Sequence, residues 1–317
     1  MEDVVWATLF PSLPRELVTL VVDHVPVGCE GRLVRHDILY TRAHVSVAAA
    51  VCPVSKNLYV LTWEDNMWIR NKEDQLVAQY TMCASIQATD MAICPVTADI
   101  YVLNRTFRGC VYVFAAADLM EKARYWEMPY ICEVHSIAVS QNGKHVFVAV
   151  NQSKPKYGQE KRQNKVLVFT PRGRLQLSCD LTCGHTFPMQ LERWPFDKDS
   201  VVILDIYDGG SLAIMNGRGK QTTPTLRLSP PLYWNMRFTV TDCGDVCVVG
   251  RPAYEAPNEC LYLYRKHELL SGQRARKPVP PTVLSMALHP ETPKVIRWLP
   301  NGTLYVCVEG QSEYVFA

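Results

Sequence analysis

A β-hairpin pattern recurs six times along the chain. The segment SIAVSQNGKHVFVAV (136–150) shows its form, with two alternating apolar runs on either side of Asn142-Gly143. Asn-Gly favours tight hairpin turns because both residues tolerate positive φ angles. One residue in the second run is equivalent in every copy: Tyr59, Tyr101, Phe147, Val202, Cys247 and Tyr305. These positions are about 42 to 58 residues apart, so the sequence predicts a fold built from repeated β units.

Each hairpin is followed by further strand-like runs. A third run such as GCVYVFA (109–115) comes after most hairpins, and usually a fourth such as LQLSCDL (175–181). Four antiparallel strands per repeat make one blade of a β-propeller. The sequence therefore predicts an all-β, six-bladed β-propeller over residues 33–317. The sixth repeat shows only three strands, and LVRHDILYTRA (33–43) is expected to complete it and close the ring.

Two of the hairpins resemble the repeat unit of NHL-type propellers. Residues 136–150 and RWLPNGTLYVCVEG (297–310) share an apolar strand, a polar turn that ends in glycine, and a Tyr/Phe-Val strand. This resemblance implies a six-bladed ring. It also implies RNA binding as one alternative function, because some NHL-type propellers hold RNA on a basic face with stacking aromatic residues.

Residues 1–32 are predicted to form an N-terminal helical extension. Ser12 is suited to cap a helix, Pro14 suits an early helical position, and the apolar residues that follow have helical spacing. The helix is expected either to pack on the ring or to dock elsewhere. Its pattern resembles the first helix of an F-box, which implies that it docks to a ubiquitin-ligase adaptor through Leu13, Pro14, Leu17 and Val21.

Composition limits the other classes of partner and location. The formal charge is +2, which gives no overall field that favours nucleic acid or a membrane. Glu2 and Asp3 stand where a secretory signal carries basic residues, and the sequence shows no apolar run long enough for a transmembrane helix. Most of the twelve cysteines lie in apolar strand-like runs, which favours free thiols and a cytoplasmic or nuclear protein.

The loops of one face are predicted to recognise a protein or peptide. In a propeller, the d–a loops (between blades) and the b–c loops (between the second and third strands of a blade) share a face. Aromatic and arginine side chains there suit a non-catalytic interaction module, an adaptor or substrate-recognition propeller that needs no cofactor or metal. The candidate partner-binding residues are Tyr130, Phe187, Tyr233, Trp234, Arg105, Arg108 and Arg251.

Two alternative functions remain open. SKPKYGQEKRQNK (153–165) is a basic insertion in a b–c loop, and RNA would contact Lys154, Lys156, Lys161 and Arg162. A second basic stretch, residues 264–277, falls on the opposite face. The other alternative is a metal-dependent lactonase-like or lyase-like propeller with its metal at the axis. The residues near the correct face are Glu133, His135, His185, Asp205 and Asp208, and the chain contains no phosphate-binding loop, GxSxG or HExxH motif.

Overall fold

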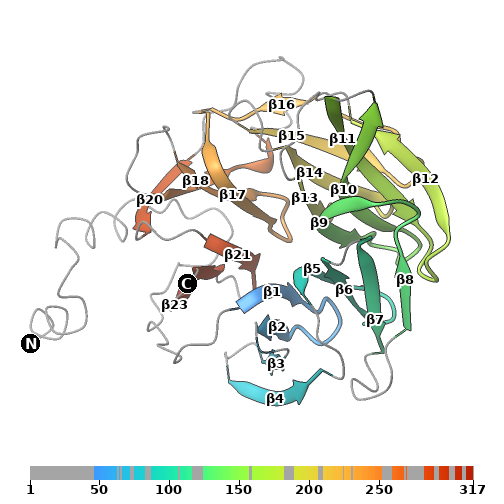
Figure 1. The fold of residues 1–317 in the computed structure, drawn as a ribbon. Helices are drawn as coiled ribbons and strands as arrows, with labels where there is room; N and C mark the ends of the chain where they lie inside the picture. Colours follow the sequence, from blue (N-terminus) through green and yellow to red (C-terminus); the bar gives the residue numbers. More distant parts are fainter. Residues whose placement is uncertain are drawn as a thin grey trace, which may run out of the picture.

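The computed structural model describes residues 46–316 apart from short gaps, the longer of which are 116–123, 182–188, 252–258 and 270–281. Within these residues the named elements are strands, and they form six separate antiparallel sheets. Figure 1 shows the sheets arranged around a common axis. The chain is therefore an all-β propeller, as the sequence predicts.

Five sheets are four-stranded blades in which each strand pairs with its neighbour in the chain. Blade 1 contains β1 (Ser46–Val51), β2 (Leu58–Thr62), β3 (Asn66–Arg70) and β4 (Leu76–Thr81). Blade 2 contains β5 (Ala88–Ile93), β6 (Ile100–Asn104), β7 (Cys110–Phe114) and β8 (Arg124–Glu127). Blade 3 contains β9 (Cys132–Val139), β10 (Val146–Lys156), β11 (Gln159–Phe169) and β12 (Leu175–Asp180). Blade 4 contains β13 (Met189–Arg193), β14 (Ser200–Asp205), β15 (Ser211–Asn216) and β16 (Leu226–Arg227). Blade 5 contains β17 (Tyr233–Val240), β18 (Val246–Arg251), β19 (Glu259–Tyr264) and β20 (Thr282–Leu288).

The last sheet corrects the predicted number of blades. It contains β21 (Pro293–Trp298), β22 (Leu304–Val308) and β23 (Ser312–Phe316), so the described residues form five four-stranded blades and one three-stranded sheet rather than six complete blades. The hairpin pattern specifies strands that pair with their neighbours in the chain, but it does not specify an outer strand contributed from far away. Residues 33–43, the expected outer strand, lie outside the described residues. The N-terminal extension with Leu13, Pro14, Leu17 and Val21 lies outside them as well.

The innermost strands surround the axis in chain order. β1 contacts β5, and the series continues through β9, β13 and β17 to β21, which in turn contacts β1. The last sheet therefore lies between blade 5 and blade 1.

Apolar side chains fill each interface between neighbouring sheets. Six buried clusters lie among the described residues, one at each interface. The repeated hairpin position contributes one residue to each cluster: Tyr59, Tyr101, Phe147, Val202, Cys247 and Tyr305. The sequence repeat thus marks the positions where one blade packs against the next.

The Asn142-Gly143 pair lies in the predicted hairpin turn, but of the two residues only Gly143 has a positive φ. Gly143 has a φ of 67°, and the Asn142 side chain accepts a hydrogen bond from the Lys144 backbone N–H at 3.0 Å. A Cβ atom on Gly143 would lie 2.9 Å from Cys94 Sγ in blade 2. Glycine therefore serves both the turn and the close approach of the adjacent blade.

Replacing Phe147 tests the inter-blade core. Phe147 is 0% exposed, and Phe147→Ala should lower the free energy of unfolding by about 3 to 5 kcal/mol, because it removes a large buried ring and leaves a cavity. Urea unfolding measures the loss. Phe196 is 48% exposed, so the control Phe196→Ala should cost about 1 kcal/mol or less. Equal losses in the two variants would contradict this description of the core.

Candidate functional site

Four of the residues in the d–a and b–c loop region lie at the junction of blades 2 and 3, and we call them the blade 2–3 patch: Arg105, Arg108, Tyr130 and Lys165. The two loops of this junction touch, because Cys132 Sγ donates a weak hydrogen bond to the Arg108 carbonyl oxygen at 3.9 Å. Tyr130 is half-buried against the core between these blades. The Lys165 ammonium lies 5.9 Å from the centre of the Tyr130 ring and pairs with Asp180 at 2.9 Å.

The two arginines of the blade 2–3 patch are exposed. Arg105 pairs with Glu133 at 3.1 Å and is 64% exposed. Arg108 lies 3.6 Å from Glu127 and is 63% exposed. Ion pairs with this much solvent contact contribute little to stability, because water screens them. Both guanidinium groups can therefore exchange these partners for acidic groups on another molecule at low cost.

The other predicted partner-binding residues do not join this patch in the described part of the chain. Phe187 lies outside the described residues. The apolar pattern indicates a strand that begins at Met236, but β17 begins at Tyr233. Tyr233 and Trp234 therefore belong to β17 and not to a d–a loop. Arg251 is the last residue of β18, where it is opposite Tyr233 across a register irregularity. These three residues thus belong to blade 5.

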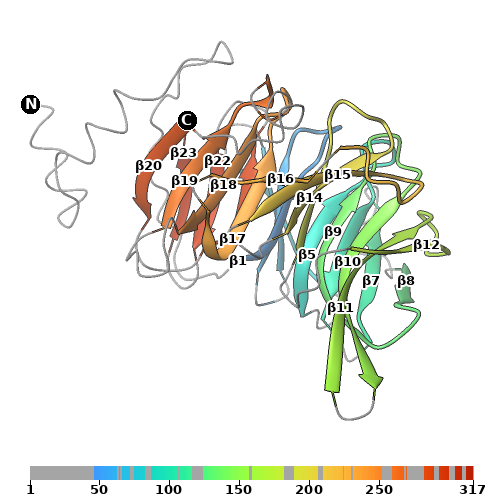
Figure 2. The same ribbon diagram turned by 90° about the horizontal axis from the view of Figure 1, so that it is seen from above.

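The basic insertion of blade 3 is an extended hairpin and not a loop. β10 and β11 stay paired without a register shift from Val146 opposite Phe169 to Lys156 opposite Gln159. Residues 151–156 and 159–164, the β10–β11 arm, project beyond the ring in Figure 2. The unbroken ladder explains why the expected loop is wrong. Within the arm, Lys154 lies opposite Lys161, and Ser153 lies opposite Arg162.

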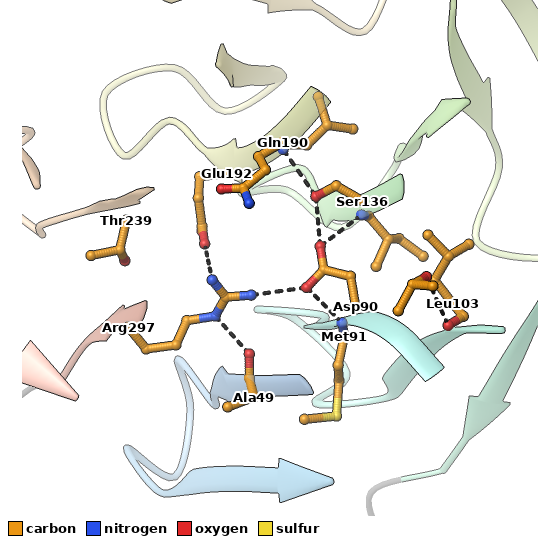
Figure 3. Close-up of polar contacts among 12 residues, drawn as sticks. Ala49, Asp90, Met91, Leu103, Ser136, Gln190, Glu192, Thr239 and Arg297 are labelled. Carbon is orange, nitrogen blue, oxygen red and sulfur yellow. Dashed lines mark hydrogen bonds and ion pairs between the residues drawn. The ribbon is translucent and has the colours of Figure 1, made fainter. Parts of the chain in front are cut away.

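A polar network at the axis was not predicted from the sequence. Figure 3 shows Arg297 of β21 reaching across the centre of the ring to three other strands. Its Nη2 lies 3.0 Å from Asp90 Oδ1 in β5, and its Nη1 lies 2.8 Å from Glu192 Oε1 in β13. Its Nε–H donates to the Ala49 carbonyl oxygen in β1 at 2.6 Å. One guanidinium therefore joins four sheets.

Further side chains continue the links from sheet to sheet. The Ser136 hydroxyl donates to Asp90 Oδ2 at 2.5 Å and accepts from the Leu191 N–H at 3.0 Å. Gln190 Oε1 accepts from the Phe238 N–H at 3.1 Å. Thr239 Oγ1 accepts from the Trp298 N–H at 3.2 Å. We call the polar side chains in these links the axial network: Asp90, Ser136, Gln190, Glu192, Thr239 and Arg297.

Burial sets the electrostatics of the axial network. It raises the pKa of Glu192 above its ordinary value, because the charged carboxylate loses its hydration. The Arg297 guanidinium acts in the opposite direction and lowers the pKa of Glu192, whereas nearby Asp90 raises it. The Glu192 carboxylate therefore depends on Arg297 for its charge.

A cavity of about 100 Å³ lies at the axis, on the side of the a–b turns and opposite to the predicted face. Its walls include three alanines, Ala50, Ala92 and Ala138, from the innermost strands of blades 1 to 3. Its charged lining residues are Lys56, Glu192, Arg193, Asp242 and Arg297. We call it the axial cavity. The sequence patterns did not identify it, because its residues are distributed over all six repeats, with two to four in each.

The described residues contain no cluster of metal donors that would support the alternative of a metal enzyme. No group of three or more His, Cys, Asp or Glu there could hold a metal ion. Glu133 and His135 lie in β9 and Asp205 in β14, whereas His185 and Asp208 fall outside the described part.

The described residues include no helix with the length and apolar character needed to cross a membrane.

The sequence matches no protein-family model and no curated protein. Solved structures match most of it. The hydrazine synthase of Kuenenia stuttgartiensis is 15% identical over 86% of this chain and 76% of its own, with a TM-score of 0.57. A streptogramin B lyase is 8% identical over 89% and 96%, with a TM-score of 0.57. The β-propeller domain of Cps50 (Swd1) from Myceliophteria thermophila is 10% identical over 86% and 83%, with a TM-score of 0.56. At these identities the similarity shows the propeller fold alone.

Removing the cation of the axial network should destabilise the ring. In Arg297→Gln, Asp90 and Glu192 lose their charged partner, and we expect the free energy of unfolding at about pH 7 to fall by about 3 kcal/mol. Denaturant unfolding measures the change. The control Arg124→Gln breaks an exposed pair with Asp99 and should change stability by about 0.5 kcal/mol or less.

The same variant should show a specific pH dependence. Loss of Arg297 raises the folded-state pKa of Glu192 further above the unfolded value, so the folded variant takes up a proton more readily than the unfolded chain. The favourable effect of that proton is complete at low pH and is lost as the pH rises through the folded pKa. The deficit relative to wild type should therefore be small at about pH 4.5 and grow towards about pH 7. A deficit that does not change with pH would contradict the assigned pairing.

Proposed function

We propose that this protein is a non-catalytic interaction module that recognises an acidic segment of another protein. The blade 2–3 patch carries the proposal. Arg105 and Arg108 are exposed and only weakly paired, and they share the junction of blades 2 and 3 with Tyr130, which is half-buried and packs against the core. Arginine and rigid aromatic side chains are the residues that dominate binding energy at protein interfaces.

The ring supports this role through its rigidity. The six inter-sheet clusters and the axial network fix the relative positions of the blades, so loops from neighbouring blades keep a constant geometry. In this proposal residues 33–43 complete the last sheet as a sixth blade. The N-terminal helix with its F-box-like pattern then links the propeller to a ubiquitin-ligase adaptor, and the protein acts in the cytoplasm or nucleus.

The double variant Arg105→Ala/Arg108→Ala tests the patch. Proteins captured from a nuclease-treated lysate by the tagged full chain should be recovered at least about tenfold less well, because each charge-assisted bond to an acidic partner contributes about 1.5 to 3 kcal/mol. Quantitative mass spectrometry measures recovery. Arg124→Ala is the matched control, since Arg124 is also 63% exposed and weakly paired but belongs to the c–d end of blade 2. Equal recovery with the double variant and the control would refute the proposal.

RNA binding is the second candidate, and the β10–β11 arm is the observation that favours it. The arm places Lys154 opposite Lys161. Like charges directly opposite each other on paired strands repel, and a bound phosphate would relieve this repulsion.

Neutralising the arm tests the RNA candidate. Replacement of Lys154, Lys156, Lys161 and Arg162 by Gln should reduce the slope of log K against log salt for single-stranded RNA by about 3, since each phosphate contact contributes about 0.7. Filter binding over a salt series measures the slope. The control replaces Arg172, Arg174, Lys198 and Lys220, which lie on turns of the opposite face, and should leave the slope unchanged. Equal slopes for the wild type and the arm variant would exclude the arm as the RNA site.

A further inference from the structure

The axial cavity has charged residues that the proposed function does not use. At its inner end, Arg297 is held between two carboxylates, at 3.0 Å from Asp90 and 2.8 Å from Glu192. The remaining charged lining residues are two cations, Lys56 and Arg193, and one anion, Asp242. Together with Arg297 and Glu192, the lining therefore carries three basic and two acidic side chains.

Arg193 is a partly buried cation in the lining of this cavity. It follows Glu192 in β13, and burial lowers its pKa because the guanidinium loses hydration. Glu192 and Asp242 favour its charged form, and the Arg193 backbone N–H donates to the Glu192 carboxylate, but neither carboxylate forms an ion pair with the Arg193 guanidinium in the described part of the chain. Glu192 Oε1 already pairs with Arg297. A partly buried guanidinium without an ion-pair partner loses hydration that a bound anion would replace.

The cavity provides space, and its lining includes a second cation, the exposed Lys56. Alanine occupies the same level of the innermost strand in blades 1, 2 and 3, opposite Tyr59, Tyr101 and Phe147 of the second strands. The resulting volume of about 100 Å³ is several times what one water molecule needs. Lys56 lies in the a–b turn of blade 1 with a φ of 62°, where its N–H donates to the Cys52 carbonyl oxygen at 2.9 Å.

We propose that the axial cavity binds the carboxylate group of a small organic acid, with Arg193 as the principal donor and Lys56 as the second cation. The planar guanidinium matches a carboxylate through two parallel hydrogen bonds. Asp242 limits the affinity by repelling the ligand. This site lies on the face opposite to the blade 2–3 patch, so it does not depend on the proposed protein partner.

Thermal unfolding of the full chain tests the site. Acetate, succinate and citrate are titrated against chloride at equal ionic strength. A ligand that binds only the folded state raises Tm with the logarithm of its concentration. At least one of the carboxylates should therefore raise Tm above the chloride control. A blocked peptide with a single Glu side chain serves as a separate arm, and a shift with the peptide alone would assign the same carboxylate chemistry to a protein side chain.

Three variants connect the shift to the cavity. Arg193→Gln should weaken the apparent affinity at least about tenfold, because a charge-assisted pair of bonds is lost. Asp242→Asn should strengthen binding, because it removes the repelling charge, and it tests the site even if Arg193→Gln does not fold. Arg124→Gln, far from the axis in blade 2, should leave affinity unchanged.

The result that overturns the proposal is equally specific. It fails if neither the acids nor the peptide shift Tm beyond chloride. It also fails if the shift persists in Arg193→Gln or if Asp242→Asn does not increase it. Opposite effects of Arg193→Gln and Asp242→Asn, with Arg124→Gln unchanged, would establish the carboxylate site.

Discussion

Neighbouring blades in this ring are separate sheets, so no backbone ladder joins one innermost strand to the next in the described residues. Side chains must connect them. Apolar clusters supply the area of contact between blades. The axial network fixes the orientation of one blade relative to the next, because each of its bonds runs from a side chain on one strand to a specific group on another. Arg297 is central to it, since a single guanidinium contacts Ala49, Asp90 and Glu192 of three other sheets. The relative positions of the loops on both faces of the ring follow from the fixed positions of the sheets.

The blade architecture could be predicted because its signals are local. Asn142-Gly143 and the alternating runs around it specify a hairpin within fifteen residues or so, and the residues equivalent to Phe147 specify the contact with the next blade. The axial network could not be predicted in this way. Asp90 and Arg297 are 207 positions apart, and each looks like an ordinary polar residue within its own strand. The arm was missed for a different reason: its lysines and glutamines suit a loop, but the hydrogen-bond ladder of β10 and β11 continues through them.

The two faces present different chemistry on one rigid body. The d–a and b–c side carries exposed arginines and a half-buried tyrosine at one junction, an arrangement suited to a large partner that approaches from solvent. The a–b side has an axial cavity of about 100 Å³ lined by partly buried and exposed charged residues, which suits a single small group. Because the axial network joins the sheets that carry both sites, a ligand on one side could change the partner affinity of the other by altering that network.

The position of Arg297 in the chain has a consequence for how the ring is assembled during synthesis. Asp90 and Glu192 are made first, and the cation that compensates both appears only after more than a hundred further residues have left the ribosome. Until then, closing blades 1 to 4 around the axis would bury two carboxylates without their counter-ion, which is unfavourable. The growing chain therefore has an electrostatic reason to keep its centre open and hydrated. The last sheet then contributes the charge that allows the whole ring to close.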